Sequence, residues 1–435
     1  MPCQRLLAEA NCAGNWRVRL ATTVDLQPWE IVRFDEYYIN DKGRAPRLPQ
    51  VTARDLAFKT KSYSLKINPR TGLVDHLSMP GARRSLVGKN AFQPTCWADL
   101  AHSWTSGSPK QARSNQVVSV SPPWDHAPAK RFRPAKPAEV ARLSPPPADK
   151  WKSTAGTAAR PINIIEHGDQ RTVVEAVFVC GASALIRQYL IGHTDGSLEI
   201  RDRLFNNHRD TMIKMMVPLA FEVADGVAET LYSAAVRAPS KRHQEHTNQR
   251  WVAMRGKQAG SVVHLTVQGS FGHSLTEKEL ALNLVRAPGY SSFNLNPDDE
   301  RANSRFIPRQ DQGEHELSWQ SMISRRFNEA QVSRAAQLFN APPVWQVYYP
   351  QPERVEHKCR AQVTGTIVVD DDQIQVVALR RSQKGGELIV RLQNTSPRER
   401  EVTVQAKPFR GRIKVRIGRY GLTTVAVKRG GKKLR

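Results

Sequence analysis

The histidine and carboxylate residues that could carry metal or acid–base chemistry occur in small, separate groups. His243 and His246 are three residues apart in RHQEH, but the HExxH order that places two histidines on one helix face around zinc is absent. We therefore expect both to lie in a polar loop. The adjacent carboxylates of Asp298-Asp299-Glu300 follow Asn-Pro in a stretch rich in Ser and Asn, which favours a solvated loop.

A second set of polar residues surrounds two expected turns. Asp202 and Asp210 flank FNNH, and His208 within it has no Ser or Cys at a spacing that predicts a nucleophile and its base. The acidic run 370–372 is interpreted as a hairpin turn, because a calcium loop needs further oxygen ligands at regular spacing. The sequence thus assigns no catalytic residue and no metal ligand.

The cysteines and the hydropathy bear on the compartment. The five cysteines have neither a CxxC pair nor the spacing of metal ligands, and their odd number and wide separation argue against a disulfide framework: they are Cys3, Cys12, Cys96, Cys180 and Cys359. No run approaches the roughly 18 apolar residues of a membrane helix, and the first residues lack a continuous apolar segment. We expect a soluble, cytoplasmic chain with no membrane partner.

The chain is strongly basic, with a formal charge of +25 from 65 Lys and Arg against 40 Asp and Glu. Clustering decides whether nucleic acid is a partner, because closely spaced cations bind phosphate by releasing counterions. Local excesses occur at 130–136 and in the last 35 residues, which hold eleven Lys and Arg against Glu401. Neither lies in a zinc-finger, RNP or helix-turn-helix pattern, so we expect a solvated basic surface and no nucleic acid.

Short alternating runs between turn residues predict an all-β protein. Tyr63, Leu65 and Ile67 alternate at period two before NPRTG, and a second strand is expected at 73–77. The other expected strands are 172–180, 184–191, 197–205, 215–223, 262–267, 280–285, 364–369, 374–379, 387–392, 401–406 and 412–417. Strands at this spacing predict a large antiparallel sandwich and then a smaller β-sandwich, with little helix. Helix-like spacing is confined to 327–339.

Composition predicts where the units begin and end. Residues 108–161 hold ten of the 28 prolines together with many basic residues, which predicts an insertion or long loop. The expected units are 1–50, an N-terminal segment of a truncated β unit; 51–330, the large β-sandwich domain; 331–345, a linker around NAPP; and 346–435, a small C-terminal β domain with a basic tail.

Several motifs follow one another in a specific order: RWV at 250–252, LALNLVRAP at 280–288, DQGEH at 311–315, LFNAPP at 338–343, VVALRR at 376–381 and LIVRLQN at 388–394. This series resembles the C-terminal half of family 38 glycoside hydrolases, the α-mannosidases, and residues 63–77 are similar to that family's hairpin YRVEFDPKTGGI. The resemblance covers roughly residues 51–406 apart from the Pro-rich segment. It implies a galactose mutarotase-like super-β-sandwich with a smaller sandwich after it.

The same resemblance implies that the catalytic groups lie elsewhere. Retaining family 38 mannosidases use an Asp nucleophile, a second carboxylate as acid/base, and zinc held by His and Asp. Their HxDxxW and HHD segments have no counterpart in this sequence. We therefore expect no catalytic residue and no cofactor in this chain, with zinc in the missing catalytic domain only and a mannoside as ligand. Two origins stay open: a truncated or split gene, or one part of a two-chain enzyme with a barrel-bearing second chain as partner.

Four residues are candidates for carbohydrate contact, in or beside a long, polar loop expected at 289–308: Arg286, Tyr290, Phe293 and Arg305. For Arg286 the alternative is an architectural role at the end of a strand. Two other functions stay open. A free-standing carbohydrate-binding module would stack sugars on exposed aromatic residues, with candidates Trp97, Trp104, Trp124, Trp251, Trp319, Trp345, Tyr348 and Tyr349. A basic polyanion binder would use 130–136 and 428–435.

Overall fold

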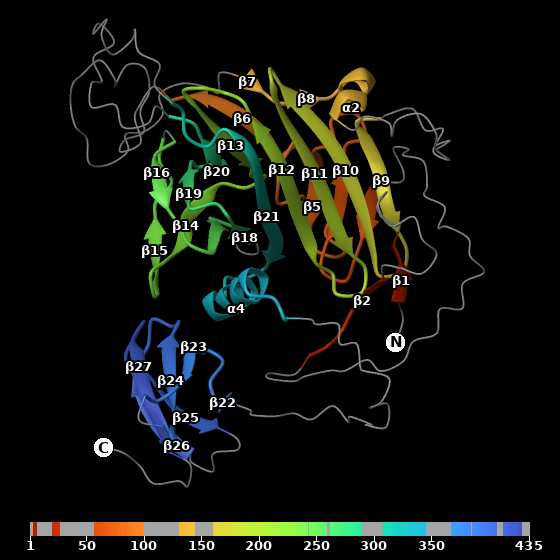
Figure 1. Cartoon of the computed structure of the whole chain (residues 1–435). Helices are drawn as coiled ribbons and strands as arrows, with labels where there is room; N and C mark the ends of the chain where they lie inside the picture. Colours follow the sequence, from red (N-terminus) through yellow and green to blue (C-terminus); the bar gives the residue numbers. More distant parts are fainter. Residues whose placement is uncertain are drawn as a thin grey trace, which may run out of the picture. The chain divides into compact units, whose positions relative to one another are not determined.

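The computed structural model describes residues 3–6, 20–26, 56–99, 130–143, 160–241, 243–258, 262–288, 308–344, 367–383, 385–406 and 412–428 (Figure 1). Nearly all of them lie in antiparallel β-strands and the turns between them, which confirms the expected all-β fold. Contacts divide the chain into two compact units. The larger unit consists of residues 1–23, 45–228 and 235–327, and the smaller unit consists of residues 24–44, 229–234 and 328–435. No helix among the described residues is long and apolar enough to span a membrane.

The largest sheet has ten strands in the order β15-β14-β17-β18-β21-β12-β11-β10-β8, with β9 also paired to β10. In Figure 1 the long strands β9 to β12 lie side by side. The strands are β8 (Arg133–Pro134), β9 (Ile162–His167), β10 (Arg171–Cys180), β11 (Ser183–Gly192), β12 (Leu198–Asn206), β14 (Val223–Thr230), β15 (Ser233–Arg237), β17 (Trp251–Gly256), β18 (Val262–Gln268) and β21 (Gly313–Ser324).

A six-stranded sheet and two small sheets complete the larger unit. The six-stranded sheet has the order β16-β19-β20-β13-β6-β7, and β3-β4-β5 and β1-β2 form the small ones. The strands are β1 (Cys3–Arg5), β2 (Leu20–Thr22), β3 (Ala57–Lys59), β4 (Ser64–Ile67), β5 (Val74–Ser78), β6 (Gln93–Ala98), β7 (Lys130–Arg131), β13 (Thr211–Pro218), β16 (Glu245–Thr247), β19 (Gly272–Leu275) and β20 (Glu279–Arg286).

One apolar core joins the sheets of the larger unit, because alternate side chains of each strand point to the same side. From β12 the core receives Leu198, Ile200 and Leu204, while from β13 it receives Ile213 and Met215. The ten-stranded and six-stranded sheets therefore pack face to face as an antiparallel sandwich, as the strand pattern predicted.

An ion pair lies inside this apolar core. Arg187 on β11 donates from Nε and Nη2 to Oδ1 and Oδ2 of Asp202 on β12, at 2.7 and 2.5 Å, and both side chains are fully buried. The guanidinium also donates to the carbonyl of Phe92 and lies 5.8 Å from the ring centres of Phe178 and Tyr189. Since an unpaired buried charge is costly, each partner requires the other.

The smaller unit contains helix α4 (Glu329–Asn340) and two three-stranded sheets, in the orders β22-β25-β26 and β23-β24-β27. Their strands are β22 (Ile367–Val369), β23 (Ile374–Arg381), β24 (Glu387–Asn394), β25 (Arg400–Ala406), β26 (Arg412–Ile417) and β27 (Leu422–Lys428). Val390 and Leu392 from one sheet share a core with Val402, Val404 and Ile417 from the other. This confirms the small C-terminal β-sandwich.

One expectation for the smaller unit is wrong and another is confirmed. The acidic run 370–372 is not a hairpin turn, because β22 pairs with β25 and β23 pairs with β24, so the run connects two different sheets. Asp370 instead accepts a hydrogen bond from the backbone N–H of Thr403, at 2.7 Å. The helix-like spacing at 327–339 is confirmed by α4, in which Val332 and Ala336 are buried. The helix covers most of the expected linker 331–345.

Part of the expected insertion 108–161 is ordered β-structure. Residues 130–143 form β7, β8 and the short helix α2 (Pro137–Leu143), so a continuous loop is wrong for this stretch. β7 pairs with β6 and β8 with β10, so the segment passes from one sheet of the sandwich to the other, with Phe132 buried in the core between them. Arg133, in the basic run 130–136, donates to both carboxylate oxygens of Glu139.

Removal of one partner of the buried ion pair is expected to destabilise the larger unit strongly. Asp202→Ala leaves the Arg187 guanidinium buried without its carboxylate, and such losses cost about 3–5 kcal/mol of unfolding free energy. Chemical denaturation measures the change. Arg203→Ala, on the same strand, is the matched control: its ion pair with Glu314 is more than 45% exposed on both sides (62% and 48%), so the unfolding midpoint should barely move. Equal effects of the two changes would contradict the prediction.

Candidate functional site

The six-stranded sheet has a second buried face, opposite the apolar core. Because β13 turns Ile213 and Met215 toward the core, its Met212, Lys214 and Met216 point to the other side. Residues directly opposite one another on neighbouring strands share a face, so the strand register assigns residues of β6, β16, β19 and β20 to the same side. We name this side the polar face; it carries Thr95, Trp97, Asp99, Met212, Lys214, Met216, Glu245, Ser274, Glu279, Ala281, Asn283 and Arg286.

Lys214 is at the centre of the polar face and is fully buried. Its ammonium group forms an ion pair with Glu245 on β16 and lies 5.0 Å from the ring centre of Trp97 on β6. The other carboxylate oxygen of Glu245 accepts a hydrogen bond from the amide of Asn283 on β20, at 2.7 Å. Burial lowers the pKa of Lys214, and the Glu245 carboxylate opposes that shift.

Arg286 extends the polar face at the end of β20. Its guanidinium donates to both carboxylate oxygens of Asp99, which follows β6 and is fully buried, whereas the Arg286 side chain is 23% exposed. The ion pair orients the guanidinium at the edge of the sheet. Arg309 pairs with Asp210 at 2.9 Å. The other expected contact residues, Tyr290, Phe293 and Arg305, lie outside the described residues, as does the acidic run 298–300.

The expectation of a polar loop is wrong for His246, which lies in a strand, while His243 lies in the connection before β16 and contacts the sheet. His246 belongs to β16, and its ring lies 5.9 Å from that of His273 on the neighbouring strand β19. His243 packs edge-on against Trp97, with 5.4 Å between ring centres. Its Nδ1 is 3.1 Å from Oγ of Ser274, and its Nε2 is 3.5 Å from a carboxylate oxygen of Glu279.

The polar face combines a buried, paired interior with a partly exposed rim. Its rim consists of Arg286 and Glu279 together with His243, which contacts Glu279 from the connection before β16; their side-chain exposures are 23%, 31% and 13%. Guanidinium and imidazole groups can donate to hydroxyl oxygens, and a carboxylate can accept from hydroxyl hydrogens. Glu279 and Arg286 are the first and last residues of β20, so these groups lie at the two ends of the strand, with His243 beside Glu279.

Sequence reasoning found Arg286 but missed Lys214 and Glu245. A lysine within the otherwise apolar strand TMIKMMVP was the available signal, because a buried ammonium group needs a partner. The aromatic residues proposed for sugar stacking fall into two groups. Trp97, Trp251 and Trp319 are at most 2% exposed, so their rings cannot stack on a sugar in solution. Trp104, Trp124, Trp345, Tyr348 and Tyr349 lie outside the described residues.

The fold is similar to that of known carbohydrate-active proteins. No protein-family model matches the sequence, and no curated protein matches it. Among solved structures, a protein in glycosyl hydrolase family 38 from Enterococcus faecalis matches with a TM-score of 0.59 and 11% identity over 84% of this chain. An α-mannosidase from Enterococcus faecalis V583 matches with a TM-score of 0.60 and 10% identity over 87%. At this identity the likeness shows the fold alone. The chain spans 41% and 42% of the length of these two proteins.

A buried histidine of the six-stranded sheet predicts acid sensitivity. His273 is 4% exposed, and burial, with His246 and Arg237 nearby, lowers its pKa from 6.5 to about 3. Below pH 6.5 the unfolded chain therefore binds a proton that the folded chain does not. Stability should fall as the pH drops from 6.5 toward 3, with His273 contributing up to about 1.4 kcal/mol per pH unit.

Denaturant unfolding at several pH values tests this contribution. His273→Gln removes the titrating group, so the loss of stability below pH 6.5 should be shallower than in the unchanged protein. His315→Gln changes a partly exposed histidine on β21 and should retain the full slope. The same slope in His273→Gln as in the unchanged protein would rule out a neutral buried imidazole.

Proposed function

We propose that this chain is a carbohydrate-associated β-region of the family 38 α-mannosidase type, which contacts a mannoside and works with a catalytic barrel on a second polypeptide. The observation that carries the proposal is the fold similarity to two longer proteins. The protein in glycosyl hydrolase family 38 matches 84% of this chain with 41% of its own length, and the α-mannosidase matches 87% of this chain with 42% of its own length. A β-region that corresponds to part of a longer enzyme supports a role beside a catalytic unit.

The sequence motifs support the same assignment through their positions in the fold. RWV leads into β17, which begins at Trp251, and LALNLVRAP covers β20 and its end. DQGEH makes the turn into β21, where Asp311 and Gly313 have φ of 50° and 108°. Such values favour Gly and Asp, which explains the residue types of this motif physically. The motifs thus fall at the ends of elements that the fold requires.

We propose the rim of the polar face as the place of sugar contact. Asp99 holds Arg286 in one orientation, so its guanidinium loses little conformational freedom when it meets a ligand hydroxyl. Glu279, in 3.5 Å contact with His243, lies at the opposite end of β20 from Arg286. Tyr290, Phe293 and Arg305 follow Arg286 in the chain and remain proposed contact residues. We assign no catalytic step to Asp99 or Glu245, because each is held in an ion pair.

Calorimetric titration of the purified chain with α-mannobiose tests the carbohydrate contact. We expect saturable binding that weakens about tenfold or more in Arg286→Ala, because a hydrogen bond to a charged group contributes about 1.5–3 kcal/mol. Arg203→Ala removes an exposed arginine from the ten-stranded sheet and should bind like the unchanged protein. Folding of Arg286→Ala is checked by its circular dichroism. The rim assignment fails if a folded Arg286→Ala binds with unchanged affinity, and the mannoside assignment fails if the unchanged chain shows no saturable binding.

An aryl α-mannoside assay separates a catalytic role from an accessory one. We expect the purified chain to release no aryl alcohol, with or without added zinc, and expect hydrolysis only with a barrel-bearing second chain. Turnover by the isolated chain would contradict the accessory role. A neighbouring coding region with the family's barrel and metal ligands would identify the partner for co-expression.

A further inference from the structure

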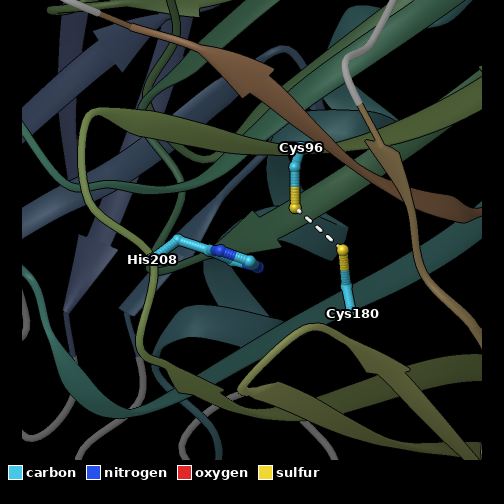
Figure 2. Close-up of side chains that lie close together, drawn as sticks. All are labelled: Cys96, Cys180 and His208. Atoms are coloured by element: carbon cyan, nitrogen blue, oxygen red, sulfur yellow. Dashed lines mark hydrogen bonds between the residues drawn. The ribbon is translucent and has the colours of Figure 1, made fainter.

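Three potential metal ligands converge between the two sheets of the larger unit. Cys96 lies on β6 of the six-stranded sheet, Cys180 ends β10 of the ten-stranded sheet, and His208 lies in the connection between β12 and β13. The two sulfur atoms are 3.6 Å apart, and one donor atom from each residue lies within 4.8 Å of the others. Figure 2 shows the ring of His208 pointing toward the two sulfur atoms.

The local backbone holds these side chains in place. Cys180 precedes a two-residue turn that starts at Gly181, whose φ is 57°. A side chain at Gly181 would lie 3.3 Å from Cε1 of His208, so the ring passes close over the turn. The backbone N–H of His208 donates to Oδ1 of Asn206 at 3.1 Å. Nε2 of His208 is buried and has no hydrogen-bond partner among the described residues.

We propose that Cys96, Cys180 and His208 bind a zinc ion. Zinc prefers tetrahedral sites of Cys sulfur and His nitrogen, and Zn–S bonds of about 2.3 Å at the tetrahedral angle place two sulfurs about 3.8 Å apart. The observed separation of 3.6 Å is close to this value, whereas a disulfide brings the sulfurs to about 2.05 Å. Two thiolates balance the charge of a divalent ion, and this soft donor set disfavours calcium and magnesium.

The zinc ion would join the two sheets of the sandwich at one end. Its ligands come from the six-stranded sheet, the ten-stranded sheet and the connection between β12 and β13. Cys96 belongs to the apolar core, whereas the next residue, Trp97, belongs to the polar face. The metal site and the proposed sugar contact thus lie on opposite sides of one sheet, so the zinc proposal stands independently of the proposed function.

Metal analysis of the full chain tests the proposal. Protein purified from zinc-supplemented medium should carry about one zinc per chain, measured by mass spectrometry of the elements against protein concentration. Replacement with cobalt should give a thiolate-to-cobalt charge-transfer band and the visible bands of a tetrahedral site. Chelator treatment should lower the thermal unfolding temperature, and zinc should restore it, because an ion bound only by the folded state stabilises that state.

Variants identify the ligands. Cys180→Ser and His208→Gln should each lower the zinc content at least several-fold and abolish or alter the cobalt spectrum. Cys3→Ser, at an exposed cysteine in β1, is the matched control and should keep both. Circular dichroism verifies that each variant is folded. The chelator test uses the unchanged chain, so it does not depend on whether a variant folds.

Two results would overturn the zinc assignment. One is a metal-free chain in which peptide mapping finds a Cys96–Cys180 disulfide, which would indicate a redox pair. The other is unchanged zinc content in a folded double variant carrying Cys180→Ser and His208→Gln, which would place the metal elsewhere. Absence of any zinc-dependent shift in the unfolding temperature of the unchanged chain also counts against the site.

Discussion

The buried pair of Arg187 and Asp202 constrains how the large sandwich can assemble. Arg187 binds the carboxylate on the neighbouring strand, and it also reaches the carbonyl of Phe92 and lies 3.6 Å from the sulfur of Met215, which belongs to the six-stranded sheet. Phe92 has a φ of 67°, a conformation unusual for a bulky residue. An apolar core tolerates many packings, whereas a charge within it is stable only where its partners converge. The pair therefore specifies the arrangement of both sheets.

Burial on both sides of the six-stranded sheet explains why its sequence departs from simple alternation of apolar and polar residues. On β13, Ile213 and Met215 enter the apolar core while Lys214 enters the polar face, where Glu245 and Trp97 surround its ammonium group. A sheet with one solvated face would leave that lysine in water. The rim of the polar face is where these fixed groups reach the surface. This supports the rim as the proposed contact with carbohydrate.

The two proposed sites use the same strand in different ways. Cys96 and Trp97 are consecutive on β6, and strand geometry sends them to opposite sides. One joins the cysteine–histidine cluster between the sheets, and the other joins the polar face. The fold similarity to parts of two longer proteins, one in glycosyl hydrolase family 38 and one an α-mannosidase, accounts for the scaffold. The chemistry proposed for each site depends on the side chains that this scaffold brings together.

The sequence by itself determined several of the long strands and helix α4, because those follow from local periodicity: Tyr63, Leu65 and Ile67 are buried on one side of their segment, and α4 occupies the segment with three- and four-residue spacing. The short strands β15, β16 and β19 were not predicted, and the strand expected at 215–223 ends at Pro218.

Only the tertiary structure decided the sites. Asp202 resembles a surface residue beside a turn until β11 places Arg187 beside it. Lys214 and Glu245 are 31 positions apart, and Cys96 and Cys180 are 84 apart. Such contacts depend on strand order and register, which arise from packing across the whole sandwich, and spacing along the chain does not encode them.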